Sequence, residues 1–214
     1  MVATSDAIAE HLRQAILRGE LKSLEPLPQD KIANDLGVSK VPLREALAEL
    51  KSEGLIIYKA NRGAFVTALS SGDAKEIYLM RVALEQLALE YAIPNLSKVD
   101  IAHARSALLM IDAEDNAQKW AELNWEFHAA LYRPAEMPHL IATIKTLHVN
   151  VGRYLVLYLD KMAFQNKSHA EHHLLLEACI SGNTEHARHI LQQHLDDASY
   201  ALQNYLNSEN GGTE

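Results

Sequence analysis

The segment Leu36-Gly37-Val38-Ser39-Lys40-Val41-Pro42-Leu43-Arg44-Glu45-Ala46-Leu47 decides the fold of the first third of the chain. Gly37 permits a tight turn between two helices, and Ser39 is a favourable cap for the second of them. Apolar residues then recur on one helical face, which leaves Lys40 and Arg44, four residues apart, on the other. The segment therefore predicts a helix-turn-helix.

The residues around this segment complete a small domain. An amphipathic helix that ends near Gly19 precedes it, and Gly54 ends its last helix. Two β-rich runs, 55–58 and 64–67, flank a turn that contains glycine and predict a hairpin. Three helices and a hairpin form a winged helix-turn-helix, which we assign to residues 1–69.

Only amphipathic helical patterns follow. We expect helices at about 73–92, 97–112, 116–132, 137–161, 168–181 and 184–206. Ser97 and Ser168 each precede an acidic residue by three positions, which is the pattern of a capping box. The predicted fold is mainly α: an N-terminal winged helix-turn-helix followed by an all-α antiparallel helical bundle at 73–206. We expect residues 207–214 to form a disordered tail.

Composition excludes several classes of protein. The 214 residues are 48% hydrophobic and 22% charged, as in an ordinary globular chain. The single cysteine, Cys179, excludes an internal disulfide framework. No apolar run approaches the ~20 residues of a membrane helix, and the first residues lack the pattern of a secretory signal. We therefore expect a soluble cytoplasmic protein without a membrane partner.

Charge is distributed unevenly about the predicted linker Ser70-Ser71-Gly72. The first 68 residues carry nine of the 20 basic and nine of the 28 acidic residues, so the net charge of −8 lies entirely in the rest. Of the 11 histidines, only His11 precedes residue 69. The two parts therefore look like modules with different partners.

The exposed face of the recognition segment is predicted to bind double-stranded DNA. A helix in the major groove presents its N-terminal residues to base edges, and arginine contacts guanine O6 and N7 together. The hairpin turn can reach the adjacent minor groove, where glycine permits close approach. The predicted contacts come from Ser39, Lys40, Val41, Arg44, Arg62 and Gly63.

Four motifs in this module point to one family. They are Ala15-Ile16-Leu17-Arg18-Gly19-Glu20-Leu21, the recognition segment, Glu53-Gly54-Leu55 and Arg62-Gly63-Ala64-Phe65-Val66. Together they make residues 4–68 resemble the DNA-binding domain of GntR-type transcription regulators. Asp30 stands at a position that is often basic in that family, and Lys40 replaces the commoner arginine. We expect Lys31 to make the phosphate contact that Asp30 cannot.

Motifs in the helical part are weaker but consistent. They are Leu79-Met80-Arg81-Val82-Ala83-Leu84-Glu85, Asn124-Trp125-Glu126-Phe127-His128, Glu171-His172, and Gly182-Asn183-Thr184-Glu185 leading to His194. This pattern resembles the effector domain of the FadR-type subfamily. The resemblance implies a divalent metal held by an acid and three histidines, with a small organic acid bound beside it.

Spacing supports a metal site independently. Asn124 and His128 lie four residues apart, so they share one helical face. His172 and His194 belong to two helices joined by a short turn, which makes those helices antiparallel neighbours. Neutral imidazoles suit a divalent transition metal, zinc first among them. We predict that Asn124, His128, His172 and His194 hold it.

One substitution leaves an alternative open at this site. Asn124 stands where the family's ligand is usually aspartate, and a neutral amide oxygen is a poorer donor to a divalent cation. A site without metal is therefore the alternative. We expect His169, His173, His186 and His189 at the surface and leave the role of His148 undecided.

A pocket for an organic acid needs a cation. By resemblance Arg81 is the first candidate, because its guanidinium can hold a carboxylate through two parallel hydrogen bonds. Arg153, with Tyr154 beside it, is the second candidate. The alternative for Arg81 is a salt bridge to Glu85, one turn along the same helix.

These observations favour a transcription regulator, and specifically a homodimeric repressor controlled by a small carboxylic acid. One recognition helix reads few bases, whereas two copies read both halves of a palindrome. The alternative from another class is a metal-dependent hydrolase with a nucleic-acid-binding N-terminal domain. The sequence places no convincing general base beside the histidines, so we predict that the protein is not an enzyme. A constitutive DNA-binding protein whose helical part only dimerises is the third possibility.

Overall fold

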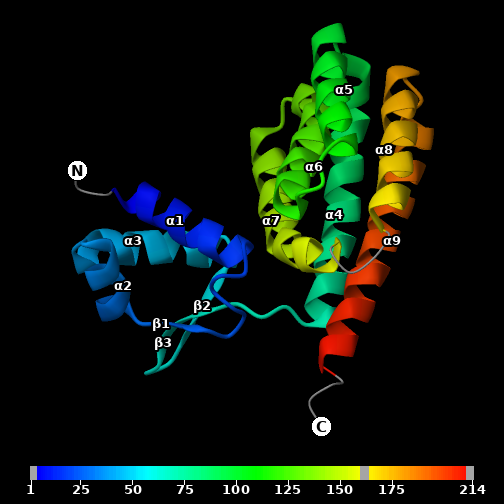
Figure 1. Ribbon diagram of the computed structural model, residues 1–214. Coiled ribbons are helices and arrows are strands. Elements are labelled where there is room, and N and C mark those ends of the chain that lie inside the picture. Colours follow the sequence, from blue (N-terminus) through cyan, green and yellow to red (C-terminus); the bar gives the residue numbers. More distant parts are fainter. Residues whose placement is uncertain (1–3, 160–163, 211–214) are drawn as a thin grey trace. The chain divides into compact units, whose positions relative to one another are not determined.

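The first unit of the chain is built on three helices, drawn in blue in Figure 1. The computed structural model describes residues 4–159 and 164–210. The three helices are α1 (Ser5–Leu17), α2 (Gln29–Leu36) and α3 (Lys40–Ser52). Gly37 ends α2 with φ of 64°, in the left-handed region that favours glycine. The turn between α2 and α3 therefore depends on this residue.

A small antiparallel sheet completes the first unit. Its strands are β1 (Pro26–Leu27), β2 (Ile56–Lys59) and β3 (Gly63–Val66), in the order β1-β3-β2. The predicted hairpin is β2 with β3. The sequence analysis missed β1, because a two-residue strand is too short to show alternation. With this sheet, the predicted winged helix-turn-helix is confirmed.

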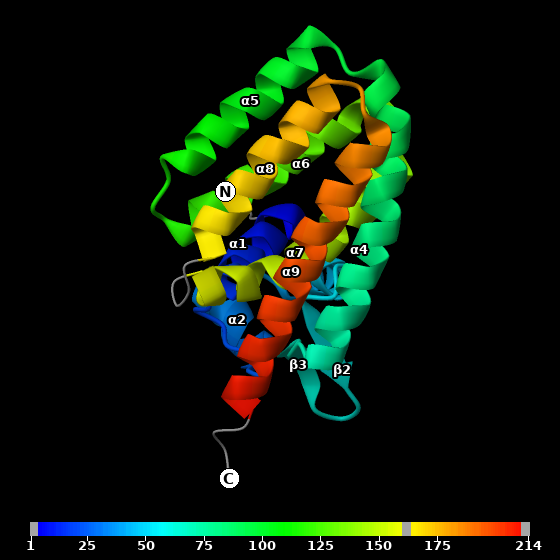
Figure 2. The same cartoon turned by 90° about the vertical axis from the view of Figure 1, so that its right-hand side faces the viewer.

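The described residues of the second unit, which starts at Ser70, form six helices and two short 3-10 turns. They are α4 (Ser71–Ala92), η1 (Ile93–Asn95), α5 (Lys98–Asp112), α6 (Ala117–Tyr132), η2 (Arg133–Ala135), α7 (Pro138–Leu159), α8 (Phe164–Ile180) and α9 (Thr184–Asn210). Within this unit α4 packs along α9, α5 against α6, and α8 against α9, as Figures 1 and 2 show. The predicted all-α bundle is confirmed. Among the described residues, no helix combines the length and apolarity of a membrane span.

Two predicted helix starts were wrong. Ser70 caps α4 and forms a capping box with Asp73, so the predicted linker is the start of the helix. Ser168 was predicted to cap the fifth helix, but α8 begins a turn earlier and buries it completely. Neither glycine nor proline occurs at 164–167, so no residue there prevents helix formation. The predicted box at Ser97 is confirmed, with Asp100 as its partner.

The end of the chain also differs from the prediction. α9 continues through Asn210, so the first four residues of the predicted tail are helical. Leu202 and Leu206 remain buried on its last turns, and the glycines that break helices come only at 211 and 212. Residues 211–214 lie outside the described part.

The interior of the second unit is apolar around one polar cluster. Phe127, Leu131 and Leu195 are completely buried, as expected of a helical core. Seven charged, amide or imidazole side chains are buried with them: Arg81, Glu85, Asn124, His128, His148, His172 and His194. Because burying such groups is costly unless they gain partners, this cluster marks the candidate site of the unit.

Candidate functional site

A groove of about 420 Å³ in the first unit brings together three of its exposed cations. Lys40 and Arg44 line it from α3, Arg62 lines it from the hairpin turn, and Gln29 and Asp30 line it from the start of α2. The elements converge because the turn at residue 37 brings the first residues of α2 and α3 together. Three cations on one surface suit a polyanion.

Two of these cations have partners on α2. The Lys40 ammonium lies 2.5 Å from the Asp30 carboxylate, and both side chains are exposed. Arg44 Nε donates to Gln29 Oε1 across 3.4 Å. The sequence analysis noted the charge of Asp30 but not that its partner would be a residue of the recognition helix.

The remaining predicted DNA contacts lie on the same unit. Val41 is 63% exposed, so its methyl groups are accessible on α3. Ser39 has the backbone conformation of an N-cap but makes no capping hydrogen bond through its side chain. Arg62 lies over the ring of Phe65, 5.8 Å from its centroid. Lys31 is exposed on α2 and is not among the residues that line the groove.

In the second unit, three predicted histidines meet. His128 of α6, His172 of α8 and His194 of α9 each offer one ring nitrogen, and these three atoms lie within 4.8 Å of one another. The ring centroids are 5.1 Å apart for His128 and His172, and 4.7 Å apart for His172 and His194. The fourth predicted ligand, Asn124, is buried one turn before His128. The arrangement could hold a metal ion.

Several nitrogen and oxygen atoms of this cluster lack partners. Among the described residues, neither ring nitrogen of His172 has a hydrogen-bond partner, although the side chain is completely buried. His128 Nε2 and Asn124 Oδ1 are also buried without a partner. Buried polar atoms are nearly always satisfied, so a group of them facing one another requires an explanation.

In two of the three histidines, the Nδ1 atom makes a hydrogen bond. His128 Nδ1 lies 3.1 Å from the hydroxyl of Tyr132, and that hydroxyl donates to Glu85 across 2.6 Å. His194 Nδ1 lies 2.8 Å from Glu171 Oε2. The free nitrogen of each of these histidines is therefore Nε2.

The protonation of the cluster suits metal binding. Burial lowers the pKa of His128 well below its ordinary value, and the neighbouring imidazoles of His172 and His194 lower it further. Burial likewise lowers the pKa of His172. At neutral pH these rings carry no charge, which is the form that binds a metal.

A small cavity adjoins the cluster. Its volume is about 20 Å³, and its lining includes Arg81, Asn124, His148 and His194. Arg81 makes the alternative contact that we considered: its Nε donates to Glu85 Oε1 across 2.7 Å. Burial alone would lower the pKa of this arginine, but Glu85, Tyr78 and Tyr132 together outweigh burial and the pKa is raised. The cavity thus contains a buried cation.

Of the other two predicted effector contacts, only Tyr154 has a described side chain. Tyr154 is buried on α7 but is not among the residues that line this cavity. The side chain of Arg153 lies outside the described part of the chain. His148, which we left undecided, is buried and lines the cavity, and burial lowers its pKa well below its ordinary value.

Sequence reasoning missed a second side of the cavity. Trp120 lines it and stacks on His172, with ring centroids 6.3 Å apart. Its Nε1 donates to His169 Nε2 across 2.9 Å, so His169 is half-buried and not the free surface residue that we expected. The sequence carried a signal for this contact, because the indole N–H of a buried tryptophan usually needs a hydrogen-bond acceptor.

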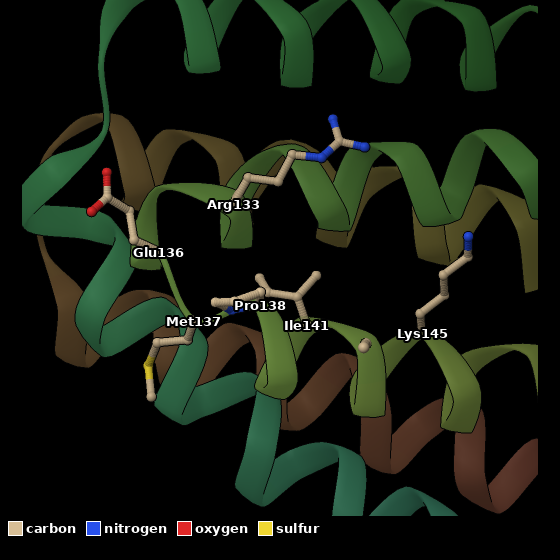
Figure 3. A pocket seen from close by; sticks show the side chains of 7 residues that line it. Arg133, Glu136, Met137, Pro138, Ile141 and Lys145 are labelled. Atoms are coloured by element: carbon tan, nitrogen blue, oxygen red, sulfur yellow. The ribbon is translucent and has the colours of Figure 1, made fainter.

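A larger groove of about 560 Å³ lies where η2 meets α7 (Figure 3). Its floor is apolar, with Met137, Pro138 and Ile141 among its residues. Figure 3 shows Arg133 extending along α6, where its guanidinium pairs with Glu126 at 2.8 Å. Lys145, which is exposed, also lines the groove, so the groove has a second cation besides the paired Arg133.

Comparisons with known proteins agree with both units. The model of "Bacterial regulatory proteins, gntR family" matches residues 4–66, and that of the FCD domain matches residues 76–197. These matches define the class: a transcription regulator with a DNA-binding domain and a separate helical domain. The chain belongs to the GntR family and has the predicted FadR-type organisation.

Individual relatives cover most of the chain. A crystal structure of a GntR-family regulator from Pseudomonas syringae pv. tomato DC3000 is 32% identical, covers 98% of this chain and 89% of its own, and has a TM-score of 0.64. The uncharacterized regulator YdhC of Bacillus subtilis is 27% identical over 85% of this chain and 90% of its own. A probable D-xylose utilization operon repressor of Paenarthrobacter nicotinovorans is 26% identical over 90% of this chain and 87% of its own.

The comparisons also decide between the classes of function. The similar proteins are transcription regulators, so this chain is a regulator and not an enzyme. The hydrolase that we considered as an alternative has no support among them.

Proposed function

We propose that this regulator is a repressor whose affinity for DNA is set by a small carboxylic acid bound in the helical domain, beside a divalent metal. The observation that carries the proposal is His172, which is completely buried with both ring nitrogens unpartnered. Such a ring is costly inside a protein unless something binds it. Ring nitrogens of two more histidines lie within 4.8 Å of one of its nitrogens, and the amide oxygen of Asn124 is also buried without a partner among the described residues.

The donors present fit a transition metal. His128, His172 and His194 would hold it through neutral imidazoles, and the buried Oδ1 of Asn124, one turn before His128, is the proposed fourth ligand. Nitrogen ligands favour zinc over magnesium or calcium, which prefer oxygen. The bound ion would supply a positive centre that attracts a carboxylate into the adjacent cavity.

Arg81 is the protein's own contribution to anion binding. It is a buried cation that lines the cavity next to Asn124 and His194. A volume of about 20 Å³ holds roughly one water molecule. An organic acid therefore enters only if α7 or α9, which line the cavity, move outward. That movement gives the acid unequal affinity for two conformations, as effector control requires.

On the DNA side, the groove lined by Lys40, Arg44 and Arg62 is the proposed contact surface. Arg44 would read a base edge, and the exposed methyl groups of Val41 suit the methyl group of thymine. We propose a homodimer, so that two recognition helices bind half-sites about one helical turn apart. Repression is proposed because a relative named as a repressor matches nearly the whole chain.

A thermal-shift screen tests the effector and the metal together. The purified protein, stripped of metal, is melted with small carboxylic acids, each with and without zinc. A ligand that binds only the folded state at 100 times its Kd adds about 2.7 kcal/mol of stability. We expect zinc to raise the melting temperature and at least one acid to raise it further.

Two variants make the screen specific. His172→Ala should abolish the effect of zinc, whereas His189→Ala on the exposed side of α9 should preserve it. If neither zinc nor any acid shifts the wild-type protein, the helical domain acts only in dimerisation and the regulator is constitutive.

A further inference from the structure

We propose that Tyr132 with Glu85, and Glu171 separately, are positioning residues that fix two histidines in the tautomer that binds metal. This inference rests on the proposed function, since it concerns the same site. It assigns a role to three residues that hold no metal themselves. Each lies behind a histidine, on the side away from the point that the three rings share.

The first arm runs from α4 to α6. Glu85 is completely buried, forms an ion pair with Arg81 and accepts a hydrogen bond from its Nε–H at 2.7 Å. Tyr132 has one hydrogen, and it donates this to Glu85 across 2.6 Å. The Tyr132 oxygen must therefore accept from His128, which places the ring hydrogen on Nδ1, 3.1 Å away. The lone pair of His128 is then on Nε2.

The second arm joins α8 to α9. Glu171 Oε2 lies 2.8 Å from His194 Nδ1. A carboxylate accepts and does not donate, so the hydrogen of His194 is also on Nδ1 and its lone pair is on Nε2. Glu171 is the residue immediately before His172. A single turn of α8 therefore supplies one ligand and the residue that orients another.

The two arms explain how a neutral set of ligands can hold a divalent ion. Asn124 and three neutral histidines bring no negative charge. Hydrogen bonding of the outer nitrogen to a carboxylate makes an imidazole a more basic ligand and fixes its ring. Removing such a partner typically lowers metal affinity 10–100-fold.

The experiment measures tautomers and metal affinity separately. Two-bond ¹H–¹⁵N spectra of the metal-free protein at pH 8 report which nitrogen of each imidazole carries hydrogen. We expect His128 and His194 as Nδ1–H tautomers in the wild type. Tyr132→Phe should abolish the preference of His128 for the Nδ1–H tautomer and leave the tautomer of His194 unchanged. The histidine of each arm is therefore the control for a substitution in the other arm.

Zinc affinity is then measured by competition with a chelator. Tyr132→Phe should lower it 10–100-fold. Glu171→Gln keeps an oxygen that can accept from His194, so the tautomer should persist while affinity falls through loss of charge. Glu177→Gln, exposed on the same helix, should change neither. Circular dichroism verifies that every variant is folded.

The outcomes separate this inference from the proposed function. Wild-type spectra with hydrogen on Nε2 of His128 or His194 overturn the inference even if zinc binds. Unchanged zinc affinity in both Tyr132→Phe and Glu171→Gln also overturns it. Correct tautomers in a protein that binds no zinc would leave the arms in place and refute the metal in the proposed function.

Discussion

Replacing Asp30 by asparagine should strengthen binding to DNA of any sequence and make it more sensitive to salt. In the free protein the Asp30 carboxylate lies 2.5 Å from the Lys40 ammonium, at the edge of the proposed DNA surface. While this pair persists, Lys40 neutralises Asp30 and not a phosphate. The asparagine has nearly the same shape but no charge, so it frees Lys40 for the DNA.

The magnitude follows from counterion release. Each phosphate contact neutralised steepens the fall of log K with log salt by ~0.9. One additional contact therefore makes the loss of affinity between 50 and 200 mM salt larger by a factor of about 3.5. Stability should change by less than about 1 kcal/mol, because the ion pair is exposed on both sides.

Fluorescence anisotropy with a random-sequence duplex at four salt concentrations measures this slope. Asp35→Asn is the matched control: it makes the same change of charge on the same helix, at an exposed position. A slope that is equal in the two variants would show that only net charge matters. In that case the proposed competition of Asp30 with DNA phosphates for Lys40 would be refuted.

Three further predictions concern both domains. Arg44→Ala should cost about 1–3 kcal/mol on a duplex selected from a random pool and much less on random DNA, measured by competition; equal losses on both would contradict base reading. Asn124→Asp should raise zinc affinity, because a carboxylate is a stronger donor than an amide; calorimetry measures it, and an unchanged affinity would place residue 124 outside the ligand set. The metal-free protein should lose stability below about pH 6.5. Burial lowers the pKa of His128, His148 and His172, so the unfolded chain takes up these protons first as pH falls. The loss of stability continues until the pH reaches the folded-state pKa, and it amounts to at most about 1.4 kcal/mol per pH unit per histidine. Urea unfolding curves at pH 7.5 and 5.5 test this prediction. Equal midpoints at the two pH values would contradict it.

The fold could be predicted largely from local rules. Gly37 is required by a left-handed backbone, and Ser97 with Asp100 closes a capping box within four residues. Such signals depend only on neighbours in sequence. Ser168 shows their limit, because the same serine-x-x-acid pattern occurs inside a helix that starts earlier. A cap is recognisable only when the preceding residues cannot be helical.

The candidate site was predictable only in part, for a related reason. Residues four apart on a helix share a face, so Asn124 and His128 could be paired from the sequence. The hydroxyl of Tyr132, which is the partner of His128, also donates a hydrogen bond to Glu85. Tyr132 and Glu85 are 47 positions apart along the chain. Which residues meet across helices depends on how α4 and α6 rotate about their axes, and periodicity alone does not define that rotation. The same holds for Lys40 and Asp30, which face each other across the turn.

Charge at the metal site links the proposed metal to the proposed effector. A divalent ion among Asn124 and three neutral histidines keeps its full charge in a buried environment. Glu85 is already paired with Arg81, and Glu171, which contacts His194, also lies 3.8 Å from the Lys167 ammonium. Neither carboxylate is therefore left to cancel the charge of the ion, and a bound carboxylate would neutralise part of it. Because coupling between two ligands is reciprocal, the acid should tighten zinc binding by the same factor as zinc tightens binding of the acid. If the acid leaves the zinc affinity unchanged, it does not bind beside the metal, and the proposed link between the two ligands is refuted.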